Sequence, residues 1–282
     1  MLDIFLERIR QKHRTYPYPK KDPAMPPLFR GLPALQEYTA TTRAQWDDCI
    51  AVCPAEALFL DEEGIALDMG KCTFCGACAL KDPGNFVQTC AGTDKGTPSV
   101  GKGVEDDPSG MVRFSGCWQL ASTKREALII RPGYDGTPPP VVVDPALQQL
   151  FTKSFRFRQV SAGGCNACEA DLNVLTTLAF DISRFGMDFV ASPRHADAMA
   201  ITGPVTRNMQ EALIKVDNAM PKPRISIAVG ACAISGGLFH GDDNKQGANG
   251  AEPHLEVDLY IPGCPPHPYT ILDGFLRFLG RI

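Results

Sequence analysis

Four cysteines in the second half of the chain follow segments that are predicted to be strands. Two come after the predicted strand 155–160, one follows the apolar run 225–231, and one follows the run 257–263: they are Cys165, Cys168, Cys232 and Cys264. In a parallel α/β sheet, ligands gather outside the carboxyl ends of the strands. The four thiols are therefore predicted to form one site, a [4Fe-4S] cluster that transfers electrons. The alternative, four unrelated buried cysteines, requires four coincidences at strand ends.

A second group of cysteines lies in the first half of the chain. Cysteines at every third position from Cys72 to Cys78 let one tight loop present three thiolates to three irons of a cubane cluster. In bacterial ferredoxins such a run continues to a Cys-Pro pair, whose cysteine ligates the other cluster. Cys53 stands before Pro54 in that way. The predicted ligands of this second [4Fe-4S] cluster are Cys53, Cys72, Cys75 and Cys78.

The companion cluster of a two-cluster ferredoxin is predicted to be lost. Three of its four ligand positions hold Arg43, Trp46 and Asp82, and only Cys49 is kept. Trp46 is expected to fill part of the space. Zinc is the alternative at the Cys72 run, but this spacing is not that of paired zinc knuckles. Three cysteines remain, either as small buried apolar side chains or as ligands of a rebuilt cluster: Cys49, Cys90 and Cys117.

Around the first cysteine run, the chain resembles the two-cluster ferredoxin-type subunit of complex I and of formate hydrogenlyase, with one cluster missing. The resemblance covers about residues 1–80. It is carried by Phe29-Arg30-Gly31, by Cys53-Pro54-Ala55-Glu56-Ala57-Leu58 and by the Cys72 run. It implies an α+β, ferredoxin-like domain at the N-terminus.

The second half is similar to the complex I subunit that carries the terminal cluster, and to the small subunits of membrane-bound [NiFe] hydrogenases. The complex I type has two adjacent cysteines at the first ligand position, whereas two residues separate Cys165 from Cys168 here. That spacing is similar to the hydrogenase branch and argues against direct quinone reduction. The matching motifs are Cys165-Asn166-Ala167-Cys168-Glu169, Ser192-Pro193-Arg194-His195-Ala196-Asp197, Thr202-Gly203-Pro204-Val205-Thr206, Val229-Gly230-Ala231-Cys232-Ala233 with Gly236-Gly237, and Pro262-Gly263-Cys264-Pro265-Pro266.

The length of 282 residues favours two domains. We predict a ferredoxin-like domain over residues 1–135, a linker over 136–150, and a flavodoxin-like α/β domain with a parallel sheet over 151–282. Alternating strand and helix patterns predict the parallel sheet. Further predicted elements are helices at 172–185, 206–220 and 269–279, strands at 112–120, 127–131, 196–202, 224–229 and 257–261, and a loop at 91–110.

The first 27 residues have a pattern of their own. Leu2, Phe5, Leu6 and Ile9 recur at the spacing of one helix face, and basic residues follow. Such a helix lies on a membrane surface, docks on a partner, or packs on its own domain. Five prolines between positions 17 and 27 then predict an extended strap across neighbouring surfaces.

Composition narrows the class of protein. The formal net charge of −4 gives no reason to expect nucleic acid as a partner. Eleven cysteines in Cys-x-x-Cys patterns favour metal ligation over disulfides. The sequence has no run of 18 apolar residues and no signal-peptide pattern. We therefore expect a cytoplasmic protein, peripheral on the cytoplasmic face of a membrane as part of a complex.

The resemblance implies an electron-transfer subunit of an oxidoreductase that holds no complete active site and no catalytic residue of its own. Its two [4Fe-4S] clusters would relay electrons to or from a [NiFe] site in a large partner subunit of a formate hydrogenlyase-like, membrane-associated hydrogenase. An electron-donor iron–sulfur subunit and membrane-embedded subunits would be the other partners. The alternative is a quinone-reducing or metal-free complex I-related module coupled to ion translocation. A further alternative, from a different class of protein, is an iron–sulfur or zinc scaffold that transfers no electrons.

Four charged residues near the second cysteine group have two interpretations each. Arg194 and His195 would either tune a cluster or form an interface salt bridge. Glu169 and Asp171 would either pass protons toward a partner or serve as ordinary helix-start carboxylates, and the second role is favoured.

Overall fold

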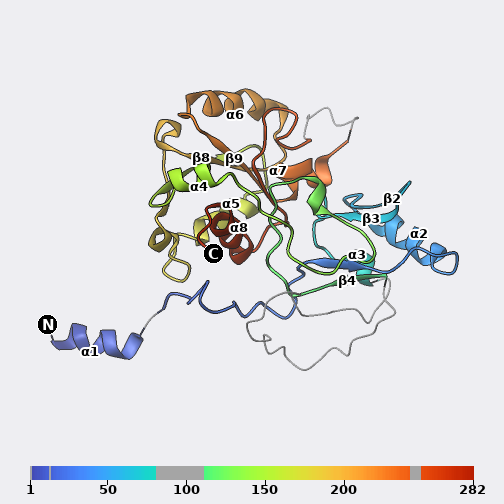
Figure 1. Ribbon diagram of the computed structural model, residues 1–282, viewed down its shortest axis with the longest axis horizontal. Coiled ribbons are helices and arrows are strands. Elements are labelled where there is room, and N and C mark those ends of the chain that lie inside the picture. The colour runs from blue at the N-terminus through green and yellow to red at the C-terminus, as the bar shows by residue number, and fades with distance from the viewer. Residues whose placement is uncertain (1, 13, 81–110, 242–248) are drawn as a thin grey trace.

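The computed structural model describes residues 2–12, 14–80, 111–241 and 249–282. The predicted loop at 91–110, together with Asp82 and Cys90, lies outside these residues. Within them, residues 151–282 (the C-terminal half) form a five-stranded sheet with helices around it (Figure 1). Residues 14–150 (the N-terminal half) contribute a three-stranded and a two-stranded sheet.

The five-stranded sheet is parallel throughout. Its strands are β6 (Phe155–Ser161), β7 (Met187–Phe189), β8 (Ala198–Thr202), β9 (Ile225–Val229) and β10 (Leu259–Ile261). Their spatial order is β7-β6-β8-β9-β10. Counted within this half the order is 2-1-3-4-5, which is the flavodoxin-like order. The predicted flavodoxin-like fold is therefore confirmed.

Side chains alternate between the two faces of this sheet. Ala198 and Ala200 pack in one core cluster, whereas Met199 and Ile201 of the same strand pack in another. The first cluster includes side chains of α5 and α8, and the second includes Leu213 of α6. The second also continues into the N-terminal half. The helices of the C-terminal half are α5 (Ala167–Val174), α6 (Arg207–Ala219), α7 (Ala231–Ser235) and α8 (Pro268–Phe278).

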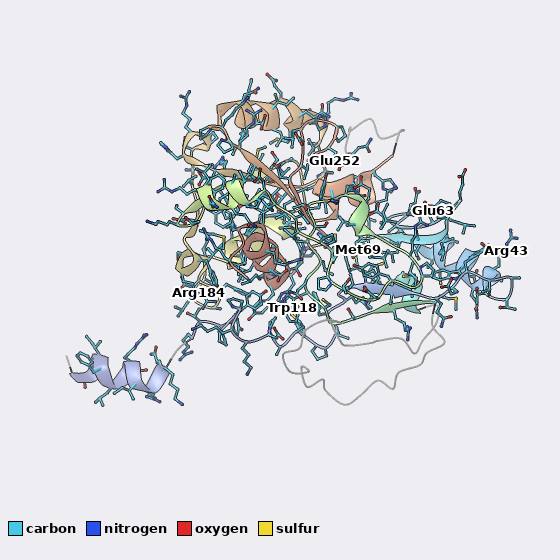
Figure 2. The ribbon with its side chains drawn as sticks, viewed as in Figure 1. Arg43, Glu63, Met69, Trp118, Arg184 and Glu252 are labelled. Carbon is cyan, nitrogen blue, oxygen red and sulfur yellow. The ribbon has the colours of Figure 1, made fainter. Side chains whose placement is uncertain are left out.

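The N-terminal half is an α+β arrangement of short antiparallel strands. One sheet has the order β2-β3-β5 and the other pairs β1 with β4. Trp46 is fully buried in the same core cluster as Cys49. Met69, which is labelled in Figure 2, belongs to that cluster too. The elements are β1 (Pro33–Leu35), α2 (Arg43–Val52), β2 (Leu58–Asp61), β3 (Gly64–Asp68), α3 (Ala77–Leu80), β4 (Val112–Phe114) and β5 (Ile129–Ile130).

Several elements end earlier than the sequence pattern predicts. The helix predicted at 172–185 begins at Ala167 and ends at Val174, where the hydroxyls of Thr176 and Thr177 donate to preceding backbone carbonyls. Hydroxyls that bond locally to backbone compete with the helix. A helix, α4 (Pro145–Leu150), forms within the predicted linker. The remaining short elements are the 3-10 helices η1 (Glu126–Leu128), η2 (Ile182–Phe185), η3 (Pro193–His195) and η4 (Gly237–Phe239).

The N-terminal segment runs along the surface of the C-terminal half before the chain enters the N-terminal half. The backbone N–H of Tyr16 donates to the carbonyl of Ala179 at 2.8 Å, and Arg184 donates to the carbonyl of Tyr18 at 2.8 Å. Ahead of this strap, helix α1 (Leu2–Gln11) lies apart from the body (Figure 1). Among the described residues, no helix has the length and apolar character needed to cross a membrane.

Candidate metal centres

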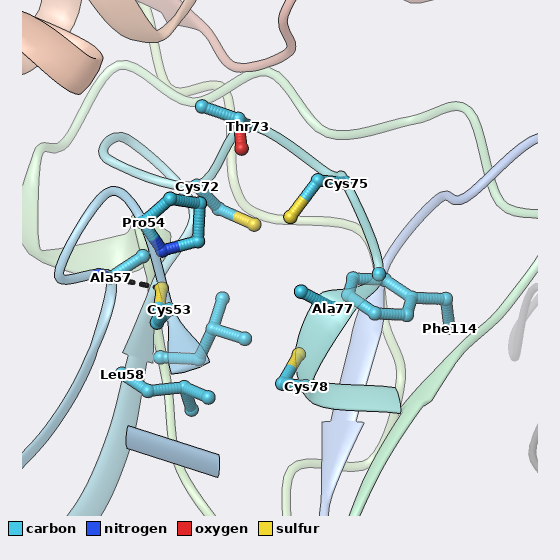
Figure 3. Close-up of a pocket in the computed structure, with 12 residues that line it drawn as sticks. Cys53, Pro54, Ala57, Leu58, Cys72, Thr73, Cys75, Ala77, Cys78 and Phe114 are labelled. Atoms are coloured by element: carbon cyan, nitrogen blue, oxygen red, sulfur yellow. Dashed lines mark hydrogen bonds between the residues drawn. The ribbon is translucent and has the colours of Figure 1, made fainter. Parts of the chain in front are cut away.

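The four cysteines of the N-terminal half line one pocket. Cys53 follows α2, whereas Cys72, Cys75 and Cys78 come from the loop after β3 and the first turn of α3. Their sulfurs point toward a common space (Figure 3). The side chain of Phe114 closes one side of it. We call these four residues the N-terminal thiol set.

Backbone hydrogen bonds fix the loops that carry this set. The N–H groups of Ala57 and Phe74 donate to the sulfurs of Cys53 and Cys72, each at 3.3 Å. The loop is further held by Asp68, whose backbone carbonyl accepts from the N–H of Cys72 at 2.9 Å. The Asp68 carboxylate is buried and accepts two hydrogen bonds from Arg125, at 2.8 and 2.6 Å. Such bidentate pairs fix geometry strongly.

Burial keeps the thiols of Cys72 and Cys78 protonated in the absence of metal. Burial, followed by the charges of Cys53, Cys49 and Cys75, raises the pKa of Cys78 to about 12. Burial also raises the pKa of Cys72. A bound cation reverses this effect, because a coordinating thiol is deprotonated by the metal. Metal binding at this pocket therefore releases protons.

The four cysteines of the C-terminal half gather at the carboxyl edge of the parallel sheet. Cys165 and Cys168 follow β6, Cys232 lies in α7 directly after β9, and Cys264 follows β10. The charges of the other three cysteines all contribute, after burial, to the raised pKa of Cys168. Burial and the charges of Cys264 and Cys165 likewise raise the pKa of Cys232 to about 11. The strand order thus brings together all four residues of this C-terminal thiol set.

Gly230 leaves room for the innermost thiol of this set. Its φ is +90°, and a Cβ at this position would lie 2.6 Å from the sulfur of Cys168. A residue with a side chain would both strain the backbone and displace the thiol. Position 230, directly after β9, therefore requires glycine because the Cys168 thiol lies beside it.

The two thiol sets are neighbours. The pKa of Cys264 is raised by burial, then by the charges of Cys165 and of Cys75, which belongs to the N-terminal set. A pocket lined by Thr73 and Phe74 on one side and by Cys264 on the other lies between the two loops. Residues about 190 positions apart in the sequence thus place the two sets side by side.

The four thiol donors of each set match the donors of an iron–sulfur cluster. In the part of the chain that the structure describes, no three His, Cys, Asp or Glu side chains are grouped so as to hold one metal ion. In a [4Fe-4S] cluster each of four cysteines ligates a different iron, so the sulfurs stand around a larger group. The pocket at the N-terminal set and the glycine beside Cys168 suit such a group. Thiolate donors also favour iron–sulfur clusters over hard cations.

Comparison with known proteins gives the family. The family described as NADH ubiquinone oxidoreductase, 20 Kd subunit, matches residues 165–278, which include the whole C-terminal thiol set. An uncharacterised protein of Methanocaldococcus jannaschii is 38% identical over 134 residues, which are 46% of this chain and 87% of that protein. The chain belongs to the 20 Kd subunit family. Proteins of this family are subunits of oxidoreductase complexes.

Two further proteins are similar to parts of this 20 Kd subunit family member. Formate hydrogenlyase subunit 7 of Escherichia coli (strain K12) is 39% identical over 155 residues, which are 52% of this chain. The match spans 60% of that relative's length. A solved structure of the membrane-bound sulfane sulfur reductase, an archaeal respiratory membrane complex, matches at 29% identity with a TM-score of 0.42, covering 49% of this chain and 75% of that one.

The charged residues singled out in the sequence take different positions in this family member. Glu169 is buried and accepts hydrogen bonds from the hydroxyls of Ser161 at 2.6 Å and Thr202 at 2.7 Å. It therefore ties α5 to the ends of β6 and β8, and the favoured role as an ordinary helix-start carboxylate is incomplete. Arg194 and His195 are exposed on η3, and their tuning role stays a prediction.

Two features of the site have no signal in the cysteine spacing. The hydroxyl partners of Glu169 are found only once β6 and β8 are paired. Cys49, which the spacing left without an assignment, is buried and its thiol donates to the backbone carbonyl of Cys78 at 3.6 Å. Cys117 is also buried.

His267, in the loop after Cys264, makes the free energy of unfolding depend on pH. Its Nδ1 accepts the backbone N–H of Tyr269 at 3.2 Å and so caps α8, and its ring stacks on that of Tyr269 at 5.5 Å. Burial lowers the pKa of His267 to about 4. Because the unfolded chain binds this proton near pH 6.5, the free energy of unfolding falls as the pH drops from about 6.5 toward 4.

We expect His267→Asn to reduce this loss of stability, because asparagine keeps a capping acceptor but does not titrate. The measurement is the urea midpoint of the folded holoprotein at pH 7.5 and at pH 5.0, for the wild type and the variant. If both proteins lose the same stability between these pH values, His267 is not the group responsible.

Proposed function

We propose that this chain is the iron–sulfur electron-transfer subunit of a membrane-associated, [NiFe] hydrogenase-like oxidoreductase. Cys53, Cys72, Cys75 and Cys78 would hold one [4Fe-4S] cluster, and Cys165, Cys168, Cys232 and Cys264 would hold the other. Such clusters supply reversible one-electron transfer when bound. The observation that carries the proposal is the convergence of two four-cysteine sets: Cys75 is close enough to Cys264 to affect its thiol, and Thr73 and Phe74 of the Cys75 loop line a pocket with Cys264.

The chain's own residues hold the two sets at a fixed separation. The shared hydrophobic core and the bond from the Ser235 hydroxyl to the Gly70 carbonyl, at 3.0 Å, join the halves beside the thiols. Because both sets belong to one chain, electron transfer between them would not require an encounter between two separate proteins. The exposed side chains of Cys75, Cys165 and Cys264 mark where partner subunits would cover the sets.

The partners in this proposal are a large subunit with a nickel–iron centre, an iron–sulfur electron donor and membrane-embedded subunits. Its place is the cytoplasmic face of the membrane. What supports the hydrogenase branch is the two-residue gap between Cys165 and Cys168, together with the similarity to a formate hydrogenlyase subunit. The second candidate, a quinone-reducing or metal-free complex I-related module, is supported by the family description. Nickel in the co-purified large subunit decides for the first, and its absence decides for the second.

The cluster assignment is tested on anaerobically purified full-length protein. We expect about eight irons and about eight acid-labile sulfides per chain, and two interacting spins in the EPR spectrum of the reduced protein, as two four-iron clusters require. A preparation with zinc and no sulfide would refute the electron-transfer function. About four irons per chain would refute one of the two cluster sites.

A further inference from the structure

Arg30 is held between the two halves of the protein by the residues on either side of it. The ring of Phe29 packs edge-on against His267 of the C-terminal half, with ring centroids 5.5 Å apart. The backbone N–H of Gly31 donates to the carbonyl of Ser115 in the N-terminal half at 2.7 Å. The position of Arg30 is therefore fixed from both sides.

The guanidinium of Arg30 lies against the turn that carries Cys75. Its Nη1 is 3.4 Å from the carbonyl oxygen of Phe74, the residue before that cysteine. The residue after it is Gly76, with φ +73°, and a Cβ there would lie 2.3 Å from Nε of Arg30. Glycine is therefore required at 76 both by the backbone and by the arginine packed on it. Arg30 contacts the chain on both sides of Cys75.

Arg30 also lines the pocket that Cys264 lines. The arginine is half-buried, which reduces the screening of its charge by solvent. Within the described ranges, no carboxylate lies at ion-pair distance from it. A positive charge that has no acidic partner among the described residues therefore lies beside Cys75 and Cys264.

We propose that Arg30 is a positioning residue that raises the reduction potential at the N-terminal thiol set, and to a smaller extent at the C-terminal set. This inference rests on the proposed function. Reduction adds one negative charge to a cluster, and a fixed cation nearby favours the more negative form. Net charge near a cluster is one of the factors that set its potential. Arg30 acts through the field at Cys75 and Cys264, without ligating iron.

The test is an EPR-monitored redox titration of the holoprotein. We expect Arg30→Gln to shift the midpoint potential of the N-terminal cluster to a more negative value, and Arg30→Lys to shift it less because the charge is kept. The matched control is Arg43→Gln, which removes the same charge at the far end of the N-terminal half (Figure 2). The Arg43 side chain is exposed. We expect Arg43→Gln to leave the midpoint potential of the N-terminal cluster unchanged.

A second variant keeps the inference testable if Arg30→Gln does not fold. Thr73→Lys adds a cation to the same loop, at a residue that lines both pockets, and is expected to shift the potential upward. Unchanged potentials in both variants, with two clusters present, would overturn the role of Arg30. Equal shifts in Arg30→Gln and Arg43→Gln would overturn it too. A wild-type protein without two cluster signals would instead refute the proposed function.

Discussion

Cys168→Ala is expected to lower the iron content from about eight to about four atoms per chain and to abolish electron delivery through this subunit. Cys168 is the innermost thiol of the C-terminal set, with Gly230 directly beside its sulfur. Alanine supplies no ligand at this position. Loss of turnover with the natural donor should exceed about 100-fold, because even changes around metal ligands cost 10–100-fold.

The matched control is Cys49→Ala, which also removes a buried thiol. Cys49 lies beside Cys78 but does not line the pocket of the N-terminal set. We expect this variant to keep about eight irons, as two intact clusters require. Iron analysis, EPR and turnover are measured on both variants. Full turnover by Cys168→Ala, or loss of four irons from Cys49→Ala, would show that the ligands have been assigned wrongly.

Much of the grouping of the cysteines could be predicted because its signals are local. The Cys72 run places three thiols by spacing alone, and the apolar runs before Cys232 and Cys264 mark strands that end at the same edge of a sheet. Parallel strands then bring those ends together whatever the loops between them do. The parallel sheet follows from the same alternation of strands and helices, whereas the strand order 2-1-3-4-5 is given by the structure.

What could not be predicted depends on contacts between distant segments. No pattern in the sequence pairs Glu169 with Thr202, because their contact exists only after β6 and β8 are aligned. The early end of α5 at Val174 reflects local hydroxyl bonds that helix periodicity does not reveal. In the sequence, Arg30 stands out only as part of the motif Phe29-Arg30-Gly31. Its place beside Cys75 depends on how the strap crosses from one half to the other.

Asp273→Ala is expected to lower the free energy of unfolding by about 3 kcal/mol or more, since removing one partner of a buried ion pair leaves the other charge uncompensated. The Asp273 carboxylate is fully buried. It accepts from Tyr18 at 2.7 Å, from Gln119 at 3.1 Å and from Arg277 at 2.7 Å. Arg277 in turn donates to the carbonyls of Pro139 and Ala121.

This one carboxylate therefore joins the strap, the segment before β5, the predicted linker and α8. Tyr18→Phe removes a single hydrogen bond of the network and is expected to cost only about 1 kcal/mol. The control is Glu211→Ala, which breaks the exposed Glu211–Lys215 pair on α6 and should change stability much less. Urea unfolding followed by circular dichroism ranks the three variants. If Asp273→Ala unfolds at the same urea concentration as Glu211→Ala, the packing of α8 and not the buried carboxylate holds the strap. In the expected order, the strap that positions Arg30 is anchored by a charge in the last helix of the chain.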